Sequence, residues 1–555
     1  MDPWLQLLAA TPIVLLVASF ATPLISARVR SPRFYSSYLT ALALLTVVTT
    51  WGVAIDYATR MKPLVYPFGG WPPPLGISFE VDGLNAFVGP IVSLVFLAAA
   101  VFCFWYFERM GKGCEWLTAL AMLMMAGSLG CIYTGDVFNF FVMLEVACIS
   151  SYAMVAFFRK RRWAIEAAAS YAFVGALATT LFLLGAVYIY ASFGTLNMAD
   201  IAAKSLGLHL SAFTRLSGSC SSGMCFGNAA VGIAVAVALM LWALTFEAGI
   251  FPNNFWVPSA YSEAPSPASA MFAGIVDKVG TYGVLRIVLT LLPIGASTIA
   301  VRIWGAPYRD VVLEVLAFLG IVTGYLGAFL MAVQNDVKRL LAYSTISHIG
   351  IMFSTLAAAT IPSVAALATA SIVFHMATHA FGEAMLFIAL GAIATVVGSR
   401  RLSDMAGLGR RHPGIAVLVA IALLSLLGMP PLGGFFSKYM MFLALVEAGY
   451  IPYAVSIVII SGISAVGYFR IMYSLFMPRA SGSSESPSAG SGSVGRSTYV
   501  ATSILAAAII ALGIAFVCGY LATPLVKYVG IAATHKGVEL YARTAAEVAA
   551  KLLPR

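Results

Sequence analysis

Long apolar runs separated by short polar stretches make up the pattern of the chain from end to end. A helix needs roughly 20 apolar residues to cross the hydrocarbon core of a bilayer, and the runs reach that length. The pattern predicts fourteen membrane-spanning helices, near residues 4–26, 36–57, 85–107, 115–134, 137–158, 167–192, 228–250, 267–292, 310–333, 338–359, 364–397, 414–446, 449–477 and 498–528. The expected fold class is an all-α polytopic membrane protein.

The composition agrees with this expectation. Hydrophobic residues make up 61% of the 555 residues and charged residues only 10%, with a mean hydropathy of +0.94. Soluble domains carry about 25% charged residues. The net charge of +10 does not indicate a nucleic-acid partner, because the basic residues gather in particular short loops. The seven cysteines include no CxxC pair, so they give no support to an iron–sulfur centre or a cysteine-bound zinc, and we identify no redox cofactor in the chain.

The basic residues predict the orientation of the chain. They lie mostly in loops after odd-numbered helices, at Arg28, Arg30, Arg33, Arg109, Lys112, residues 159–162, Lys338, Arg339, Arg400, Arg401, Arg410, Arg411, Arg479 and Arg496. Short basic loops stay in the cytoplasm. We therefore expect a multi-pass protein of the cell membrane with both termini outside.

Two predicted spans are interrupted by proline. Pro252 and Pro258 fall at the break of helix seven, and Pro430 and Pro431 fall at the break of helix twelve. A broken helix persists in lipid only where protein or a water-filled cavity satisfies its freed backbone groups. The breaks lie five helices apart, and an odd offset reverses the direction of crossing. They predict two inverted five-helix repeats, helices 4–8 and helices 9–13.

These features divide the chain into five segments. Residues 1–114 hold helices one to three and an external hairpin loop, residues 115–292 the first repeat and residues 309–477 the second. Residues 478–497 are a Ser/Gly-rich stretch, which predicts a flexible linker. Residues 498–555 hold helix fourteen and a tail.

Three charged residues inside the first repeat are candidates for a proton pathway, since an intramembrane charge is costly. Glu145 lies in an otherwise uncharged span, where the alternative role is a structural ion pair with another helix. Glu247 and Lys278 flank the first break, and a change in their separation would switch their proton affinities. The alternative is a fixed salt bridge. Asp277 is expected to point to another side of its helix.

A stripe of titratable residues lies on helix eleven, where His375, His379 and Glu383 are spaced by four. Two imidazoles followed by a carboxylate suit a proton relay, and His348 on helix ten could extend it. Structural hydrogen bonding and a divalent metal site remain as alternatives for the same spacing.

Lys438 follows the second break, near the middle of a long helix. A lysine in an apolar helix can accept and release a proton. Its alternative role is snorkelling to an interface. Arg286 and Arg470 lie nearer to helix ends and are expected to anchor them.

Cys220 and Cys225 lie in a loop expected on the outside. They could form a small disulfide in an oxidising compartment. Two free cysteines are the equal alternative.

Five stretches carry a resemblance to a known family. They are GDVFNFFVMLEVACISSYA (135–153), FEAGIFPNNFWVPSAYSEAPSPASAMFAGIVDKVGTYGVLR (246–286), NDVKRLLAYSTISHIG (335–350), THAFGEAMLFIALG (378–391) and GMPPLGGFFSKYMMF (428–442). The chain resembles the proton-translocating antiporter-like membrane subunits of respiratory complex I, membrane-bound hydrogenases and multisubunit cation/proton antiporters. Within that family it is most similar to the D-type subunit of the antiporters.

The resemblance implies roles for particular residues. Glu145 matches the family's helix-five glutamate, Lys278 its helix-eight lysine and Lys438 its helix-twelve lysine or glutamate. Glu247 and Glu383 stand where the family commonly has lysine. These two departures alter the usual pairing of glutamate with lysine between helices five and seven.

The function implied is a proton-translocating subunit of a multisubunit Na⁺/proton antiporter, embedded in the bilayer beside other membrane subunits. The alternative is a proton-pumping subunit of a respiratory redox complex, of the NADH:quinone oxidoreductase or membrane-bound hydrogenase type. A third possibility is a structural subunit that no longer conducts. In each case the chain would carry no cofactor, so it would belong to an enzyme only as a subunit of an NADH dehydrogenase (quinone)-type translocase.

Overall fold

The computed structural model describes residues 2–217, 229–296, 301–477 and 494–553. Within these residues, twelve helices are long and apolar enough to cross a membrane, and thirteen if the bent pair at residues 402–427 is one span. The twelve are α1 (Pro3–Ser26), α2 (Pro32–Arg60), α3 (Asn85–Met110), α4 (Cys114–Tyr133), α5 (Val137–Val155), α6 (Arg162–Phe193), α9 (Ala229–Ala248), α13 (Tyr308–Val333), α14 (Val337–Ser354), α15 (Ala365–Val397), α19 (Ile451–Phe476) and α20 (Arg496–Val517). The polytopic all-α prediction is confirmed.

The two remaining expected spans, near 267–292 and 414–446, consist of shorter helices. The first contains α11 (Ser266–Met271), the π-helix η3 (Phe272–Val276) and α12 (Asp277–Leu291). The second contains α17 (Pro413–Leu427) and α18 (Gly433–Glu447). The count of fourteen and the inverted-repeat arrangement stay predictions.

Two helices end in the same way before a proline-containing break. α9 ends at Ala248 and α17 at Leu427, each followed by a glycine with left-handed backbone, Gly249 (φ 76°) and Gly428 (φ 92°). Residues with a Cβ rarely adopt this conformation, so glycine is the residue that suits both positions. The chain then resumes as α10 (Trp256–Glu263) and α18, leaving Pro252 and Pro430–Pro431 in the non-helical breaks. Pro258 lies inside α10.

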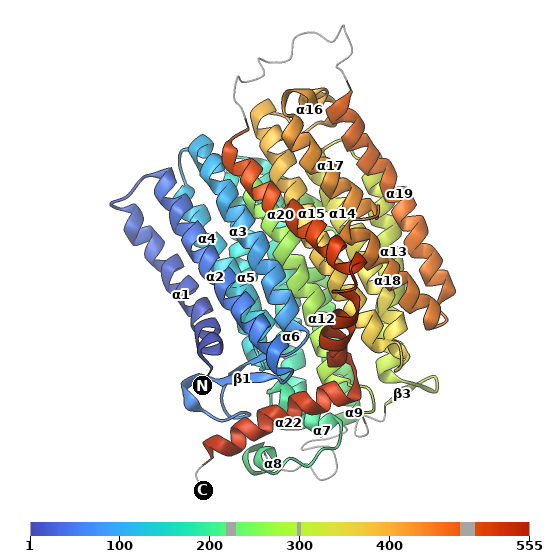
Figure 1. Cartoon of the computed structure of the whole chain (residues 1–555). Coiled ribbons are helices and arrows are strands. Elements are labelled where there is room, and N and C mark those ends of the chain that lie inside the picture. Colours follow the sequence, from blue (N-terminus) through green and yellow to red (C-terminus); the bar gives the residue numbers. More distant parts are fainter. Residues whose placement is uncertain (1, 218–228, 297–300, 478–493, 554–555) are drawn as a thin grey trace.

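The helices stand alongside one another in a bundle, and both chain ends lie at the same end of it (Figure 1). α15 is the central helix, and every residue from Ala368 to Ala394 is buried. It packs against α11, α14, α17, α18 and α20. Polar groups on α15 must therefore find partners on neighbouring helices.

The end of the bundle near the termini is covered by short elements (Figure 1). The expected external hairpin contains the antiparallel strands β1 (Leu64–Pro67) and β2 (Ser78–Val81). The C-terminal helix α22 (His535–Leu552) packs there against α7 (Met198–Ser205), α8 (Ser211–Ser217) and β1. The remaining elements, in various parts of the chain, are η1 (Phe68–Gly70), η2 (Ala156–Phe158), β3 (Arg302–Ile303), β4 (Ala306–Pro307), η4 (Thr355–Thr360), η5 (Leu402–Met405), α16 (Leu408–Arg411), α21 (Ala522–Pro524), η6 (Leu525–Val529) and η7 (Gly530–Ala533).

Two sequence predictions fall wholly or mostly outside the described residues. They are the disulfide between Cys220 and Cys225 and the flexible linker, of which residues 478–493 are not described. The last residues of the predicted linker are described and start α20 at Arg496.

Candidate functional site

A chain of side-chain hydrogen bonds crosses the second half of the bundle around His348 of α14. His348 Nε2 lies 2.8 Å from the Tyr468 hydroxyl on α19, and His348 Nδ1 lies 2.9 Å from His375 Nε2 on α15. His375 Nδ1 lies 2.9 Å from the Ser437 hydroxyl on α18. One line of contacts therefore joins four helices.

The same chain continues to a buried carboxylate. The Tyr468 hydroxyl lies 2.6 Å from Ser344 Oγ, and Ser344 donates to Glu383 Oε1. One set of proton positions satisfies every link: Ser437, His375, His348, Tyr468 and Ser344 each donate to the next group, and Glu383 accepts last. In this set the Ser437 hydroxyl turns to His375 and away from the Gly434 carbonyl, which lies 3.1 Å from it. The tautomers are inferred from these partners. A hydrogen-bonded chain with one donor-to-acceptor order is able to pass a proton along its length.

Lys278 of α12 lies beside this chain and is fully buried. Its Nζ atom lies 3.0 Å from the Ala273 carbonyl, 2.7 Å from Asp277 Oδ2 and 2.8 Å from His379 Nδ1. A charged ammonium has three protons to donate, and three acceptors surround this one. His379 Nδ1 therefore accepts from Lys278, which leaves the proton of a neutral imidazole on Nε2.

A gap of 4.0 Å separates His379 Nε2 from Glu383 Oε1. His379 Nε2, Glu383 Oε2 and Asp277 Oδ1 are buried and have no hydrogen-bond partner among the described residues. Buried polar atoms without partners are uncommon in folded proteins. A small side-chain rotation or an intervening water molecule would connect Lys278 through His379 to Glu383.

The expected pairing of Glu247 with Lys278 is wrong. Lys278 forms its ion pair with Asp277, and the expectation that Asp277 points elsewhere is also wrong. The long lysine side chain folds back toward the π-helix η3, where the Ala273 carbonyl accepts from Nζ, and this brings the ammonium group beside Asp277. The charge of Lys278 is thus balanced within its own helix.

Glu247 lies in a separate pocket of donors at the end of α9. Its Oε2 atom lies 3.4 Å from Cys148 Sγ on α5, and its Oε1 atom lies 3.3 Å from the Tyr171 hydroxyl on α6. The ring of Tyr171 stacks on Trp256 at 3.9 Å, and Trp256 Nε1 donates to the Phe246 carbonyl over 3.0 Å. Trp256, which follows the helix break, thus fixes the ring of Tyr171 and with it the hydroxyl that faces Glu247.

Tyr261 of α10 lies between the two charged clusters. Its ring packs against Trp256 at 6.0 Å and against Phe387 of α15 at 5.9 Å. Its hydroxyl is buried and has no partner among the described residues. The phenol is suited to link Glu247 to the polar groups on α12 and α15.

Lys438 is buried near the second break. Its Nζ atom lies 2.7 Å from the Leu426 carbonyl and 3.0 Å from Ser461 Oγ. Gly428 forms the break, and the carbonyls that its left-handed turn leaves free are those that Lys438 contacts. The snorkelling alternative for Lys438 does not describe this position, because its ammonium group binds inside the bundle.

A model of the family described as "NADH:quinone oxidoreductase/Mrp antiporter, TM" matches residues 134–464. That stretch contains all eight predicted proton-pathway residues. The chain belongs to this family. The resemblance that the sequence motifs carry is confirmed.

Relatives within the antiporter-like family include subunits of two kinds of complex. The chain is 31% identical over 437 residues to NADH-quinone oxidoreductase subunit N of Desulforudis audaxviator, covering 78% of this chain and 80% of the relative. It is 30% identical over 398 residues to the D-type subunit of the Na⁺/H⁺ antiporter of Alkalihalophilus pseudofirmus, covering 71% and 72%. Sequence identity to the two kinds is nearly equal.

Chains of solved membrane complexes share the fold. A chain of the membrane-bound sulfane sulfur reductase, an archaeal respiratory membrane complex, matches with a TM-score of 0.81 and 26% identity over 97% of this chain and 100% of that chain. A chain of the Mrp complex from Dietzia sp. matches with a TM-score of 0.77 and 23% identity, over 97% and 99%. Both belong to multisubunit assemblies, as expected for a protein with membrane-subunit partners.

Glu145 lies on α5, one helical turn before Cys148. Its side chain is partly exposed on the outside of the bundle, between the exposed residues Val142 and Ile149. Within the described residues it makes no hydrogen bond or ion pair. The structure therefore places Glu145 one helical turn before Cys148, the residue that contacts Glu247, without a direct hydrogen bond or ion pair to another predicted residue.

His375, His379 and Glu383 form no metal site in the structure: among the described residues no group of three or more His, Cys, Asp and Glu side chains could hold a metal ion. Their nitrogens and oxygens contact Ser437, Lys278 and Ser344 instead.

A second polar cluster lies where the hairpin meets α12. Arg286 donates from Nη1 and Nη2 to Asp82, over 2.6 and 2.9 Å, and this ion pair ties α12 to the residue that follows strand β2. Burial alone would raise the pKa of Asp82, but the Arg286 guanidinium holds it below its usual value. Nearby, burial raises the pKa of Glu80 to about 7, although hydrogen bonds with Tyr541 and Ser78 oppose the shift.

Proposed function

We propose that this chain translocates protons along the line of buried polar residues that runs from Glu247 through Lys278 to the hydrogen-bonded chain between Glu383 and Ser437. It would do so as the D-type component of a multisubunit Na⁺/proton antiporter. The observation that carries the proposal is the unbroken hydrogen-bonded chain from Ser437 to Glu383, buried in the centre of an apolar bundle. A buried polar network in a membrane has a high cost, and structural stability alone does not call for two histidines and a glutamate within one hydrogen-bonded chain.

The proposed transfer uses the two tautomers of histidine. A proton arriving at Ser437 displaces one proton at each link, and Glu383 takes up the last one. Each group then holds its proton on the opposite side, and resetting the chain needs rotation of the hydroxyls and return of both imidazoles to their first tautomer. Lys278 controls the exit of this path, because only its charged form has enough protons to donate to His379, Asp277 and the Ala273 carbonyl at once.

Protons reach Lys278 in this proposal from the first half of the molecule. Glu247 exchanges protons with its donors Cys148 and Tyr171, and Tyr261 connects it to Asp277 and Lys278. With Glu247 in the position where a lysine is usual, the carrier in this half is a carboxylate.

Glu145 supports the proposal that partners complete the path. A carboxylate at the middle of a membrane helix is costly against lipid, and Glu145 is partly exposed at that depth. We place a neighbouring subunit against α5, with Na⁺ exchanged by the whole assembly. The assembly lies in the cell membrane, with both termini outside and the basic loops in the cytoplasm.

A second candidate function is proton pumping in a respiratory redox complex. It is favoured by the 31% identity to NADH-quinone oxidoreductase subunit N and by the 26% identity to the sulfane sulfur reductase chain. Purification in mild detergent followed by mass spectrometry of the bound subunits separates the two candidates. Small antiporter subunits favour the first, and iron–sulfur or nickel subunits favour the second.

Transport by the purified assembly tests the proposal itself. We expect His348→Gln to reduce proton uptake into proteoliposomes by about 100-fold, the scale on which a proton-transfer group contributes. His209→Gln, on an exposed loop, is the matched control and should leave uptake unchanged. Equal uptake in an assembled His348→Gln variant would contradict the proposed path.

A further inference from the structure

A large basic cavity opens at the end of the bundle opposite the termini. It has a volume of about 810 Å³ and lies between α3, the α5–α6 loop and α10 on one side and α14 and α15 on the other. Six basic residues line it, together with two acidic ones, Glu263 and Asp336; the six are Arg109, Arg161, Arg162, Lys338, Arg400 and Arg401. The proton path described above does not use this cavity.

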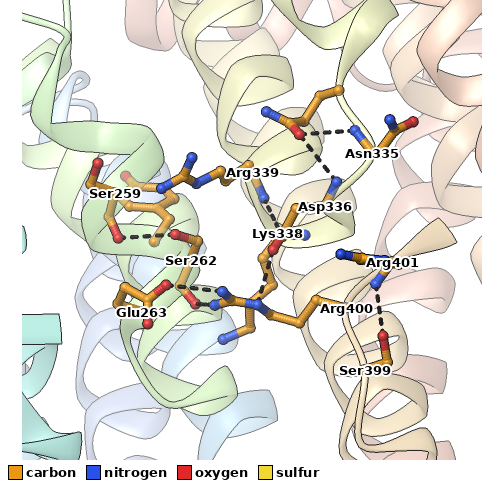
Figure 2. A network of polar contacts seen from close by, with 12 residues as sticks. Ser259, Ser262, Glu263, Asn335, Asp336, Lys338, Arg339, Ser399, Arg400 and Arg401 are labelled. Atoms are coloured by element: carbon orange, nitrogen blue, oxygen red, sulfur yellow. Dashed lines mark hydrogen bonds and ion pairs between the residues drawn. The ribbon is translucent and has the colours of Figure 1, made fainter. Parts of the chain in front are cut away.

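Arg400 forms ion pairs with both acidic residues (Figure 2). Arg400 Nη2 lies 2.9 Å from Glu263 Oε1, and Arg400 Nε lies 2.9 Å from Asp336 Oδ2. Asp336 Oδ1 also caps α14 by accepting from the Lys338 and Arg339 backbone N–H groups. Both carboxylates therefore form ion pairs with Arg400, so neither is an unpaired acidic ligand for a cation.

Of the other five basic residues, Arg162 forms an ion pair with Glu166 over 2.7 Å, and the remaining four have no acidic partner among the described residues. Lys338 is buried, and its Nζ atom donates to the Ala264 carbonyl over 2.7 Å and to Ser269 Oγ over 3.1 Å. Arg109 and Arg161 lie over the rings of Trp105 and Phe158. Among the described residues no carboxylate lies within 4.0 Å of Lys338, Arg109, Arg161 or Arg401. Like charges gathered around a cavity repel one another, so a bound anion would stabilise this end of the bundle.

We infer that this cavity binds a phosphate group, with Lys338 at its base and the arginines at its rim. Arginine forks match the oxygens of phosphate, and lysine supplies a compact charge beneath them. The basic loops belong to the predicted cytoplasmic surface, where anionic lipids concentrate and where basic pockets between membrane helices bind lipid headgroups. Trp163 lines the cavity with 65% of its surface exposed, as expected at a membrane interface. The geometry thus favours the headgroup of an anionic phospholipid over a free phosphate.

Lipid binding can be measured without reference to transport. The full chain, in its assembly, is exchanged into nanodiscs of phosphatidylcholine with increasing phosphatidylglycerol, and bound lipid is counted by native mass spectrometry. We expect one phosphatidylglycerol to stay bound to the chain. Arg109→Gln/Arg161→Gln should weaken its binding by roughly 10- to 30-fold, on the scale of the contribution of each basic residue near a membrane surface.

The matched control removes two arginines from another exposed loop at the same end, Arg28→Gln/Arg30→Gln, and should retain the lipid. In parallel, inorganic phosphate is added to the detergent-purified assembly, and its melting temperature is recorded. Stabilisation by phosphate but not by phosphatidylglycerol would assign the site to a free phosphate and support the binding chemistry. Absence of binding by both in the unmodified protein, or equal loss in the two double variants, would overturn the inference.

Discussion

The Nζ atom of Lys278 lies 2.8 Å from Nδ1 of His379, and this contact joins the two predicted halves of the chain. Lys278 belongs to α12 and His379 to the central helix α15. Through Asp277 on one side and the gap to Glu383 on the other, this pair stands between the first charged cluster and the hydrogen-bonded chain. In the proposed path, it is the point at which the two halves exchange a proton.

Removing the lysine should stop coupled transport. We expect Lys278→Ala to reduce ion-coupled proton transport by the complete assembly by about 100-fold or more, because His379 and Asp277 lose their common partner. Proteoliposome assays measure this directly. Lys160→Ala, on an exposed loop, serves as the control. Unchanged transport in an assembled Lys278→Ala variant would remove Lys278 from the path.

Glu247 should set the pH profile of the first half. We expect Glu247→Lys to shift the pH optimum of transport, because Cys148 and Tyr171 would face an ammonium in place of a carboxylate acceptor. Glu247→Gln keeps the shape and one acceptor oxygen, and it separates loss of charge from loss of packing. An unaltered pH profile in both variants would make Glu247 a structural residue.

The ion pair between Asp82 and Arg286 should stabilise the junction of the hairpin and α12. Removing one partner of a buried pair leaves the other charge uncompensated, at a cost of about 3–5 kcal/mol. We therefore expect Asp82→Asn to lower the melting temperature in detergent markedly, and the double variant Asp82→Asn/Arg286→Met to lower it less. A double variant as unstable as the sum of the two single variants would show that the pair contributes nothing as a pair.

Glu80 should make the stability of the protein depend on pH. Its folded-state pKa of about 7 exceeds the ordinary value of 4.5, so the folded protein holds this proton more tightly than the unfolded chain. Stability then falls as pH rises from about 4.5 to 7, by about 3 kcal/mol in total. Glu80→Gln should remove this fall, measured as melting temperature between pH 5 and 8. The exposed Glu447→Gln should retain it, and a Glu80→Gln profile identical to the unmodified protein would contradict the assignment.

In the sequence, the residues of the site could be recognised by their charge within an apolar span. This charge identified Lys278, Glu247, Glu383 and Lys438 as buried polar residues, and the proline pattern located both helix breaks. The neutral links Ser344, Tyr261 and Tyr468 gave no such signal. Serine and tyrosine are ordinary in membrane helices, and a serine hydroxyl often bonds only to its own helix. Their role depends on which helices become neighbours.

Pairing of charges was the part that sequence could not settle. Glu247 and Lys278 flank one break, yet each finds its partners elsewhere, in Tyr171 and Cys148 and in Asp277 and His379. A lysine side chain is long and flexible, so its sequence position leaves the location of its ammonium group open by several ångströms. The basic residues of the loops could be recognised in the sequence. The cavity that they line could not, because it forms only where α10, α14 and α15 come together in the fold.

The most direct test of the proton path removes a single oxygen atom from its middle. Tyr468→Phe keeps the ring but leaves His348 Nε2 and Ser344 Oγ without their shared partner, at about 1–3 kcal/mol. We predict that proton uptake by proteoliposomes of the complete assembly falls roughly 5- to 150-fold, while Tyr188→Phe, at an exposed position on α6, leaves it unchanged. Uptake by an assembled Tyr468→Phe variant equal to that of the unmodified protein would contradict the account.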